Sequence, residues 1–130
     1  MLKKIATMLV LLLASVLPLQ AQEGHPLTGT WQGEWGKDNF LTLIMTWDGK
    51  AIVGTTNPGP TATTITSAVL DSSTWTVTIT TDLKNDKGEV TKFVLIGKLE
   101  TIGSPLRFIQ GHWENGHDSG EMKLARQSGA

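Results

Sequence analysis

Side chains that could bind a metal or transfer a proton gather in one stretch near the C-terminus, HWENGHD at residues 112–118. In an extended strand His112 and Glu114 would point to one face, with His117 within reach across a turn. Imidazole and carboxylate groups are zinc ligands, but this stretch has no established metal-binding spacing. Its Asn115-Gly116 pair is typical of a hairpin tip. The sequence therefore favours a solvated turn, and we predict no metal-binding residues.

Tryptophan is the second residue type with a chemical role, because a flat indole face can stack on a sugar or an aromatic ligand. The chain has five tryptophans and no tyrosine. All five share the parity of apolar neighbours in alternating segments, which predicts that they point inward: Trp31, Trp35, Trp47, Trp75 and Trp113. Core packing is the favoured role for all of them. Trp35 and Trp113 are the better candidates for a stacking surface.

Catalytic groups are sparse. The serines lie in turns or in the C-terminal tail, without the G-x-S-x-G motif of a nucleophile. Five carboxylates could gather at one end of the fold and do acid–base work: Glu34, Asp38, Asp86, Glu114 and Asp118. Surface loops commonly carry such residues. We therefore expect no catalytic residues, no enzyme activity and no cofactor.

The elements that must position these residues are short strands. After residue 21, apolar and polar residues alternate with period two between turn residues, and no segment has the spacing of an amphipathic helix. Asp48-Gly49 predicts a two-residue type I′ hairpin, and Asn57-Pro58-Gly59-Pro60 predicts a loop. The eight predicted strands cover residues 29–36, 41–47, 51–56, 63–70, 74–80, 90–99, 106–113 and 120–126.

Eight short strands joined by short turns predict an all-β fold, an eight-stranded antiparallel up-and-down β-barrel, with an open sandwich as the alternative. Alternate turns of such a meander lie at the same end. The turns after the odd-numbered strands would form one rim, here called the odd rim, at residues 36–39, 57–62, 84–89 and 114–120. At the other end, the even end, the turns after residues 47 and 70 look tight, and Trp31 is expected to fill the closed interior. Any pocket should therefore open at the odd rim.

The first 21 residues have the layout of a secretory signal peptide. Lys3 and Lys4 precede an apolar run over residues 5–17, and a more polar exit ends in Ala21. The run is shorter than the roughly 20 residues that span a bilayer. We predict cleavage after Ala21, one domain over residues 22–130 that does not span a membrane, and a periplasmic or secreted location.

Charge and cysteine content exclude several classes of function. Loss of Lys3 and Lys4 leaves nine Lys and Arg residues against twelve Asp and Glu residues, a net charge of −3. Without a basic cluster, a nucleic acid is not an expected partner. The chain has no cysteine, so it has no disulfide, thiolate metal site or cysteine nucleophile.

Several motifs resemble those of known barrels. Leu27-Thr28-Gly29-Thr30-Trp31 resembles the G-x-W opening of lipocalins and, more closely, of avidins, both calycin-like barrels. Asp48-Gly49 with Val53-Gly54-Thr55 resembles the second avidin hairpin, and Gly116-His117-Asp118 resembles the avidin ending. Nearly the whole mature chain is similar to small secreted bacterial β-barrel proteins of unassigned function. They share its opening, Trp47-Asp48-Gly49-Lys50, the Asn57-Pro58-Gly59-Pro60 turn and Gly111-His112-Trp113. The resemblance implies an avidin/lipocalin-like barrel and leaves the ligand open.

The biotin site of avidins does not carry over to this chain. By the resemblance, the ureido group would be held by an Asn, a Ser, a Tyr-x-Ser pair and a late Asp. The matching positions here are Gly33, a position near Lys37, Thr56 and Pro58, and only Asp118 agrees. A site built on buried hydrogen bonds fails when its polar groups are missing.

The sequence predicts a calycin-like binding module that holds a small, partly apolar ligand or a loop of a protein partner at the odd rim. The expected ligand-binding residues are Trp35, Asn57, Trp113 and Asp118. The alternative is a structural or interaction protein with a filled barrel and no pocket. In that case six large side chains would occupy the space above Trp31: Leu43, Met45, Val77, Ile79, Leu95 and Ile109.

Overall fold

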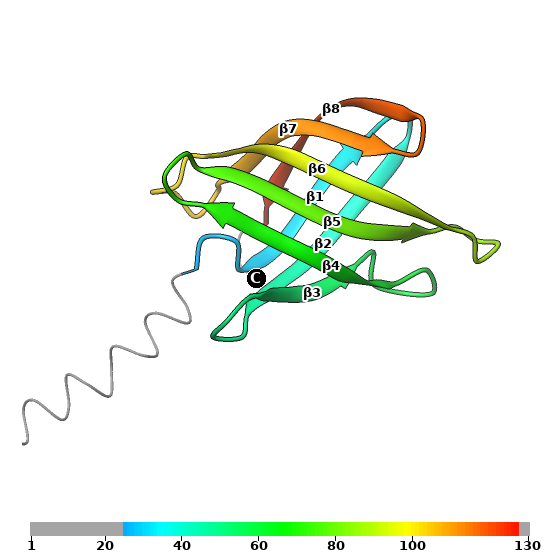
Figure 1. Cartoon of the computed structure of the whole chain (residues 1–130), viewed down its shortest axis with the longest axis horizontal. Helices are drawn as coiled ribbons and strands as arrows, with labels where there is room; N and C mark the ends of the chain where they lie inside the picture. Colours follow the sequence, from blue (N-terminus) through cyan, green and yellow to red (C-terminus); the bar gives the residue numbers. More distant parts are fainter. Residues whose placement is uncertain (1–24, 128–130) are drawn as a thin grey trace, which may run out of the picture.

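The computed structural model describes residues 25–127, and these residues form eight strands (Figure 1). The strands are β1 (Gly29–Trp35), β2 (Asn39–Trp47), β3 (Ile52–Thr56), β4 (Thr63–Asp71), β5 (Thr76–Lys84), β6 (Val90–Glu100), β7 (Phe108–Asn115) and β8 (Asp118–Arg126). They pair in chain order, and β1 also pairs with β8, so the antiparallel sheet closes into a barrel. The predicted eight-stranded up-and-down barrel is confirmed, and the open sandwich does not hold. The predicted signal peptide at residues 1–21 lies outside the described residues.

Alternate residues of each strand point into the barrel, and most of these inward residues are apolar. In β5, for example, Val77 and Ile79 are fully buried, while Thr76, Thr78 and Thr80 alternate with them on the outer face. All six residues expected to fill the interior are fully buried, and they belong to one core cluster with Trp31. The middle of the barrel is therefore packed with side chains.

The even end is closed by the segment that precedes β1. Leu27 is fully buried there, and its carbonyl accepts a 2.9 Å hydrogen bond from Trp31 Nε1. Arg107 donates to the Pro26 carbonyl at 3.0 Å, and Arg126 donates to the Thr28 carbonyl at 2.9 Å. Trp31 fills this end as expected. Not every turn at the even end is tight. The loop at residues 101–107, between β6 and β7, is longer than any turn of the odd rim.

The connection between β2 and β3 corrects the predicted two-residue hairpin. Trp47 pairs with Ile52, so the loop has four residues rather than two. The Asp48 carboxylate accepts hydrogen bonds from the backbone N–H groups of Lys50 and Ala51, at 2.8 and 2.9 Å, and these bonds stabilise the wider loop. They also lower the pKa of Asp48. Only Gly49 in this loop has a positive φ, +101°.

Trp75 corrects the prediction that all five tryptophans point inward. It lies in the turn between β4 and β5, with φ of +56°, and its exposed fraction is 37 %. Because the backbone of Trp75 is left-handed, the regular alternation of strand residues is interrupted there. Val77 points inward, but this does not predict the direction of Trp75 two residues earlier. The turn is held instead by Asp71, whose carboxylate accepts hydrogen bonds from the Ser73 backbone N–H and hydroxyl.

A search of the described residues for helices that could span a membrane finds none.

Candidate functional site

An open hollow of about 440 Å³ lies at the odd rim, at the end of the barrel where the sequence predicted a pocket mouth. Its volume is within the range of about 300–1,000 Å³ typical of small-molecule sites. It lies among the turn residues that follow β1, β3 and β5 and the end of β7. The lining has three apolar side chains, Trp35, Phe40 and Leu83, and eight polar ones, Asp38, Asn39, Asn57, Lys84, Asn85, Glu89, Thr91 and Asn115.

Beneath the hollow is a layer of three aromatic rings. Trp35 packs edge-to-face against Phe93 and Trp113, with ring centroids 5.2 and 4.9 Å apart. The rings of Phe93 and Trp113 are nearly parallel, 6.2 Å apart. Trp113 lies over Gly120, where a Cβ atom would come within 3.0–3.1 Å of the indole. Its Nε1 is buried and has no hydrogen-bond partner within residues 25–127. Phe93 and Trp113 belong to the core cluster, so Trp35 lines the hollow and packs on the core at the same time, and these contacts fix its position.

Asn57 is held in the wall of the hollow by two hydrogen bonds to the same residue. Its backbone N–H donates to the Thr42 carbonyl at 2.7 Å, and its Oδ1 accepts from the Thr42 N–H at 2.9 Å. The backbone is left-handed here, with φ of +49°. Asparagine tolerates this conformation better than most residues. With Oδ1 engaged, the Nδ2 group is the part of the side chain that remains to donate to a ligand.

Two further amides of the lining are fixed in the same manner. Asn115 Nδ2 donates to Thr91 Oγ1 at 3.0 Å and to the Lys92 carbonyl at 2.8 Å, which leaves its Oδ1 as an acceptor. Asn85 Oδ1 accepts from the backbone N–H groups of Lys87 and Glu89, both at 2.9 Å. Its Nδ2 donates to Glu89 Oε1 at 3.0 Å, and this bond positions the Glu89 carboxylate. Half of the eight polar side chains of the lining, the three amides and Glu89, are therefore held by hydrogen bonds within the protein.

The charges around the hollow are unequal. Asp38 and Glu89 contribute two carboxylates and Lys84 one ammonium group, so the lining has a formal charge of −1. No ion pair among the described residues joins Lys84 to either carboxylate. Asp38 lies in the turn after β1, next to Asn39, and its backbone is left-handed, with φ of +60°. The hollow is thus polar and slightly acidic, with an aromatic floor.

The structure brings together two of the four predicted ligand-binding residues. Trp35 and Asn57 line the hollow, whereas Trp113 is only 5 % exposed and lies behind Trp35. Asp118 is exposed and pairs with Asn115, because the last turn has two residues rather than the predicted seven. Asn115 lines the hollow in its place. Of the five carboxylates considered for acid–base work, Asp38 is in the lining.

Sequence reasoning missed most of the polar lining. The sequence places Asn85 and Glu89 in an odd-rim turn without indicating their roles, and it gives no sign that Phe40, which is 72 % exposed, lines the hollow. The available signal was the concentration of Asn, Asp and Lys in the odd-rim turns. Parity identifies inward-facing residues along a strand, but it does not say which turn residues converge.

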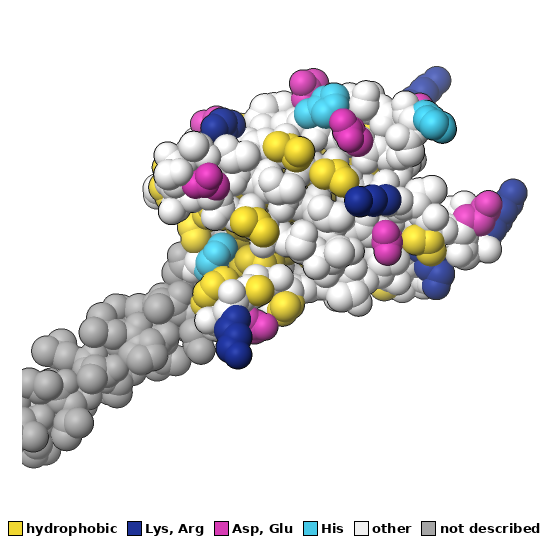
Figure 2. Space-filling model, viewed as in Figure 1, with side chains coloured by type: hydrophobic (Ala, Val, Ile, Leu, Met, Phe, Trp, Pro, Cys, Tyr) yellow, Lys and Arg dark blue, Asp and Glu magenta, His cyan; other side chains and the backbone are white. Residues whose placement is uncertain are grey.

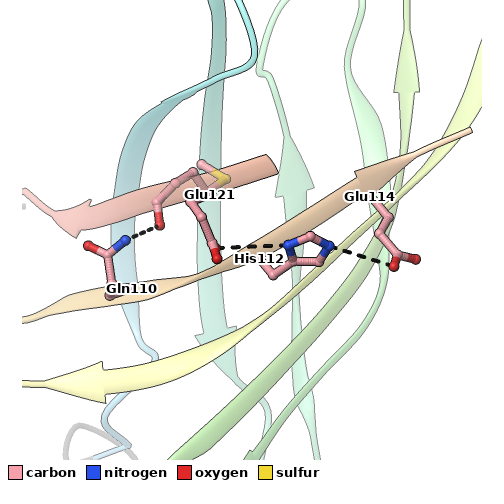
Figure 3. A network of polar contacts seen from close by, with 5 residues as sticks. Gln110, His112, Glu114 and Glu121 are labelled. Atoms are coloured by element: carbon pink, nitrogen blue, oxygen red, sulfur yellow. Dashed lines mark hydrogen bonds and ion pairs between the residues drawn. The ribbon is translucent and has the colours of Figure 1, made fainter. Parts of the chain in front are cut away.

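The cluster around His112 lies on the outer face of β7 and β8 (Figure 3). His112 is 3.8 Å from Glu114 and 3.9 Å from Glu121, both measured between a ring nitrogen and a carboxylate oxygen. Gln110 donates to the Met122 carbonyl at 3.2 Å nearby. His117 lies in the following turn, and the described residues contain no group of three side chains arranged to hold a metal ion. The side chains of His112, Glu114 and Glu121 are all about half exposed or more.

Phe40 also borders a separate open hollow of about 420 Å³, whose other lining residues lie on β1 and β2. A smaller hollow of about 260 Å³ lies between β3 and β4, near the start of the described chain. These two strands share only two residue pairs, so their ends diverge. His25 stacks on Trp47 there, with ring centroids 4.8 Å apart. Figure 2 shows apolar side chains gathered on the surface beside the beginning of the described chain. His25 therefore has a packing role that the sequence did not indicate.

Comparisons of the chain with protein-family models, with curated proteins and with solved structures give no match.

Proposed function

We propose that this protein is a periplasmic or secreted calycin-like binding module that holds a small ligand in the odd-rim hollow. The observation that carries the proposal is the set of pre-oriented amides, Asn57, Asn85 and Asn115, around the partly buried Trp35. Fixed polar groups bind a ligand without first losing their own side-chain entropy, which strengthens binding. The same hydrogen bonds hold the turns and strand ends around the hollow, so the three amides keep their orientation without a ligand.

The packed interior favours a second candidate function. A pocket inside the barrel would need an empty volume above Trp31, yet the six large side chains expected there in a filled barrel are fully buried. A filled barrel can act through its outer surface as a structural or interaction protein. The binding proposal is compatible with this packing because the hollow lies above Trp35 and outside the filled region.

The location is part of the proposal and depends on residues 1–21. A basic start, an apolar run and an exit at Ala21 support export through a cleaved signal peptide. We expect the exported protein to begin at Gln22 or within a few residues of it. N-terminal sequencing tests this directly, and exported protein that still begins at Met1 would contradict it.

Tryptophan fluorescence tests the binding proposal, because Trp35 lines the hollow and Trp75 lies at the even end. The titrants are sugars, aromatic acids, haem and fatty acids, applied to the wild type, Trp35→Phe and Trp75→Phe. We expect at least one titrant to change the emission of the wild type and of Trp75→Phe, with most of the change lost in Trp35→Phe. A response that Trp35→Phe retains in full would place binding elsewhere. No response to any titrant would favour the filled-barrel function.

A further inference from the structure

We infer that the odd-rim hollow takes a neutral saccharide ring, an inference that rests on the proposed binding function. Three properties of the lining lead to this chemical class. The first is that most of the lining residues are polar. The second is that hydrogen-bond donors and acceptors not used within the described part of the protein lie beside an exposed aromatic surface. The third is the net negative charge of the lining.

The excess of polar groups argues against a lipid or another wholly apolar ligand. Eight of the eleven lining side chains are polar. A hydrocarbon ligand would remove water from these groups without replacing its hydrogen bonds, and unsatisfied polar groups weaken binding. A ligand that fits the hollow should therefore present polar groups to these side chains as well as an apolar face to Trp35, Phe40 and Leu83.

The positions left free by internal hydrogen bonds suit hydroxyl groups. Asn57 Nδ2 remains as a donor, and Asn115 Oδ1 remains as an acceptor, since their other amide atoms are engaged. Glu89 has one carboxylate oxygen bonded to Asn85 and a second one free to accept. A sugar hydroxyl both donates and accepts, so neighbouring hydroxyls of one ring can satisfy a donor and two acceptors fixed around it.

The apolar part of the lining suits the C–H face of a pyranose. Phe40 is 72 % exposed, and Trp35 is held in place by Phe93 and Trp113. An aromatic side chain in the lining of a polar hollow can bury surface against an apolar face of a ligand. A sugar ring combines such a face with a hydroxylated edge, and a neutral sugar does so without the carboxylate that amino acids and organic acids carry.

The charge of the lining sets the preference among sugars. The lining contains two carboxylates, Asp38 and Glu89, and one ammonium group, Lys84. A ligand carboxylate would be repelled by the net negative charge, so a uronic acid should bind more weakly than its uncharged counterpart. The isosteric change Asp38→Asn removes one carboxylate and keeps a residue type that tolerates the left-handed backbone at this position.

Isothermal titration calorimetry on the mature chain provides the test. The titrants are neutral methyl glycosides and disaccharides, the matching uronic acid and amino sugar, benzoate and a fatty acid. The variants are Phe40→Ala, Asn57→Asp, Asp38→Asn and, as a matched exposed control at the even end, Leu106→Ala. Asn57→Asp keeps the acceptor for the Thr42 N–H and removes the donor.

We expect a neutral saccharide to bind, and Phe40→Ala and Asn57→Asp each to weaken it about three- to tenfold, while Leu106→Ala leaves it unchanged. The uronic acid should bind more weakly than the neutral sugar, with a smaller difference in Asp38→Asn. Saccharide binding that none of these variants alters, or binding confined to the amino sugar, would overturn the inference. Binding of benzoate or the fatty acid alone, weakened by Phe40→Ala, would overturn the saccharide class and leave the proposed function standing. If no titrant binds, both are overturned.

Discussion

Replacement of Asn57 separates the two reasons why an asparagine occupies this position. Its Oδ1 accepts a hydrogen bond from the Thr42 N–H at 2.9 Å, and its backbone has φ of +49°. Alanine would lose the hydrogen bond and adopt the left-handed conformation at greater cost. Glycine would lose the hydrogen bond alone. Aspartate would keep the acceptor and a similar conformational tolerance.

The expected magnitudes follow from these two terms. The hydrogen bond contributes about 0.5–1.5 kcal/mol to the free energy of unfolding. The left-handed conformation costs a non-glycine residue about 1–2 kcal/mol, and asparagine less than most. Asn57→Ala should therefore lower the free energy of unfolding by about 2–3 kcal/mol, Asn57→Gly by about 1 kcal/mol, and Asn57→Asp by less than about 0.5 kcal/mol. For a domain of this size, about 1 kcal/mol shifts Tm by roughly 4–8 °C.

Thermal unfolding followed by far-ultraviolet circular dichroism, with urea titration for the free energies, gives the order of the three variants. The reasoning predicts Asp above Gly above Ala. Equal stabilities of the Gly and Ala variants would show that backbone conformation contributes nothing here. An Asp variant as unstable as the Ala variant would refute the role assigned to Oδ1.

Three other predictions concern the stability of the barrel. Gly49→Val should cost about 1–3 kcal/mol, because φ is +101° there, while Gly103→Val, whose Cβ would meet open space, should be close to neutral in the same urea titration. Trp31→Ala should cost about 3–5 kcal/mol as a buried truncation, against about 1 kcal/mol or less for the exposed Trp75→Ala, and equal losses would contradict the burial assigned to Trp31. Burial lowers the pKa of His25 from its ordinary 6.5, so protonation favours the unfolded chain and the contribution of His25 to stability should be lost as pH falls below about 6.5. His25→Asn should remove that part of the pH dependence, and an unchanged pH profile would refute it.

The strands could be predicted because alternation is a direct consequence of strand geometry. A residue such as Ile79 faces inward whatever the turns do, since its neighbours on both sides are threonines on the outer face. Closure followed from the number of strands and the cost of exposed edges. Turn lengths did not follow from the pattern. The four-residue loop at Asp48 depends on two side-chain hydrogen bonds, and the outward position of Trp75 depends on one left-handed residue.

The candidate site was predictable only where it depended on topology. The meander places the turns after β1, β3, β5 and β7 at one end, which located the hollow and two of its residues, Trp35 and Asn57. Asp118 was misplaced because a tight final turn brings it into the ladder opposite Asn115. The roles of Asn85 and Asn115 depend on contacts between turns and strands that are distant in sequence.

The central claim, that a small ligand binds over Trp35 at the odd rim, is tested most directly by the five indole N–H signals in ¹H–¹⁵N spectra. These side chains report on both ends of the barrel, since Trp35 and Trp113 lie at the odd rim and Trp31, Trp47 and Trp75 lie toward the even end. On addition of a ligand found by titration, the signals of Trp35 and Trp113 should shift, and the other three should stay in place. Shifts confined to Trp47 and Trp75 would contradict the claim and place the binding site at the even end.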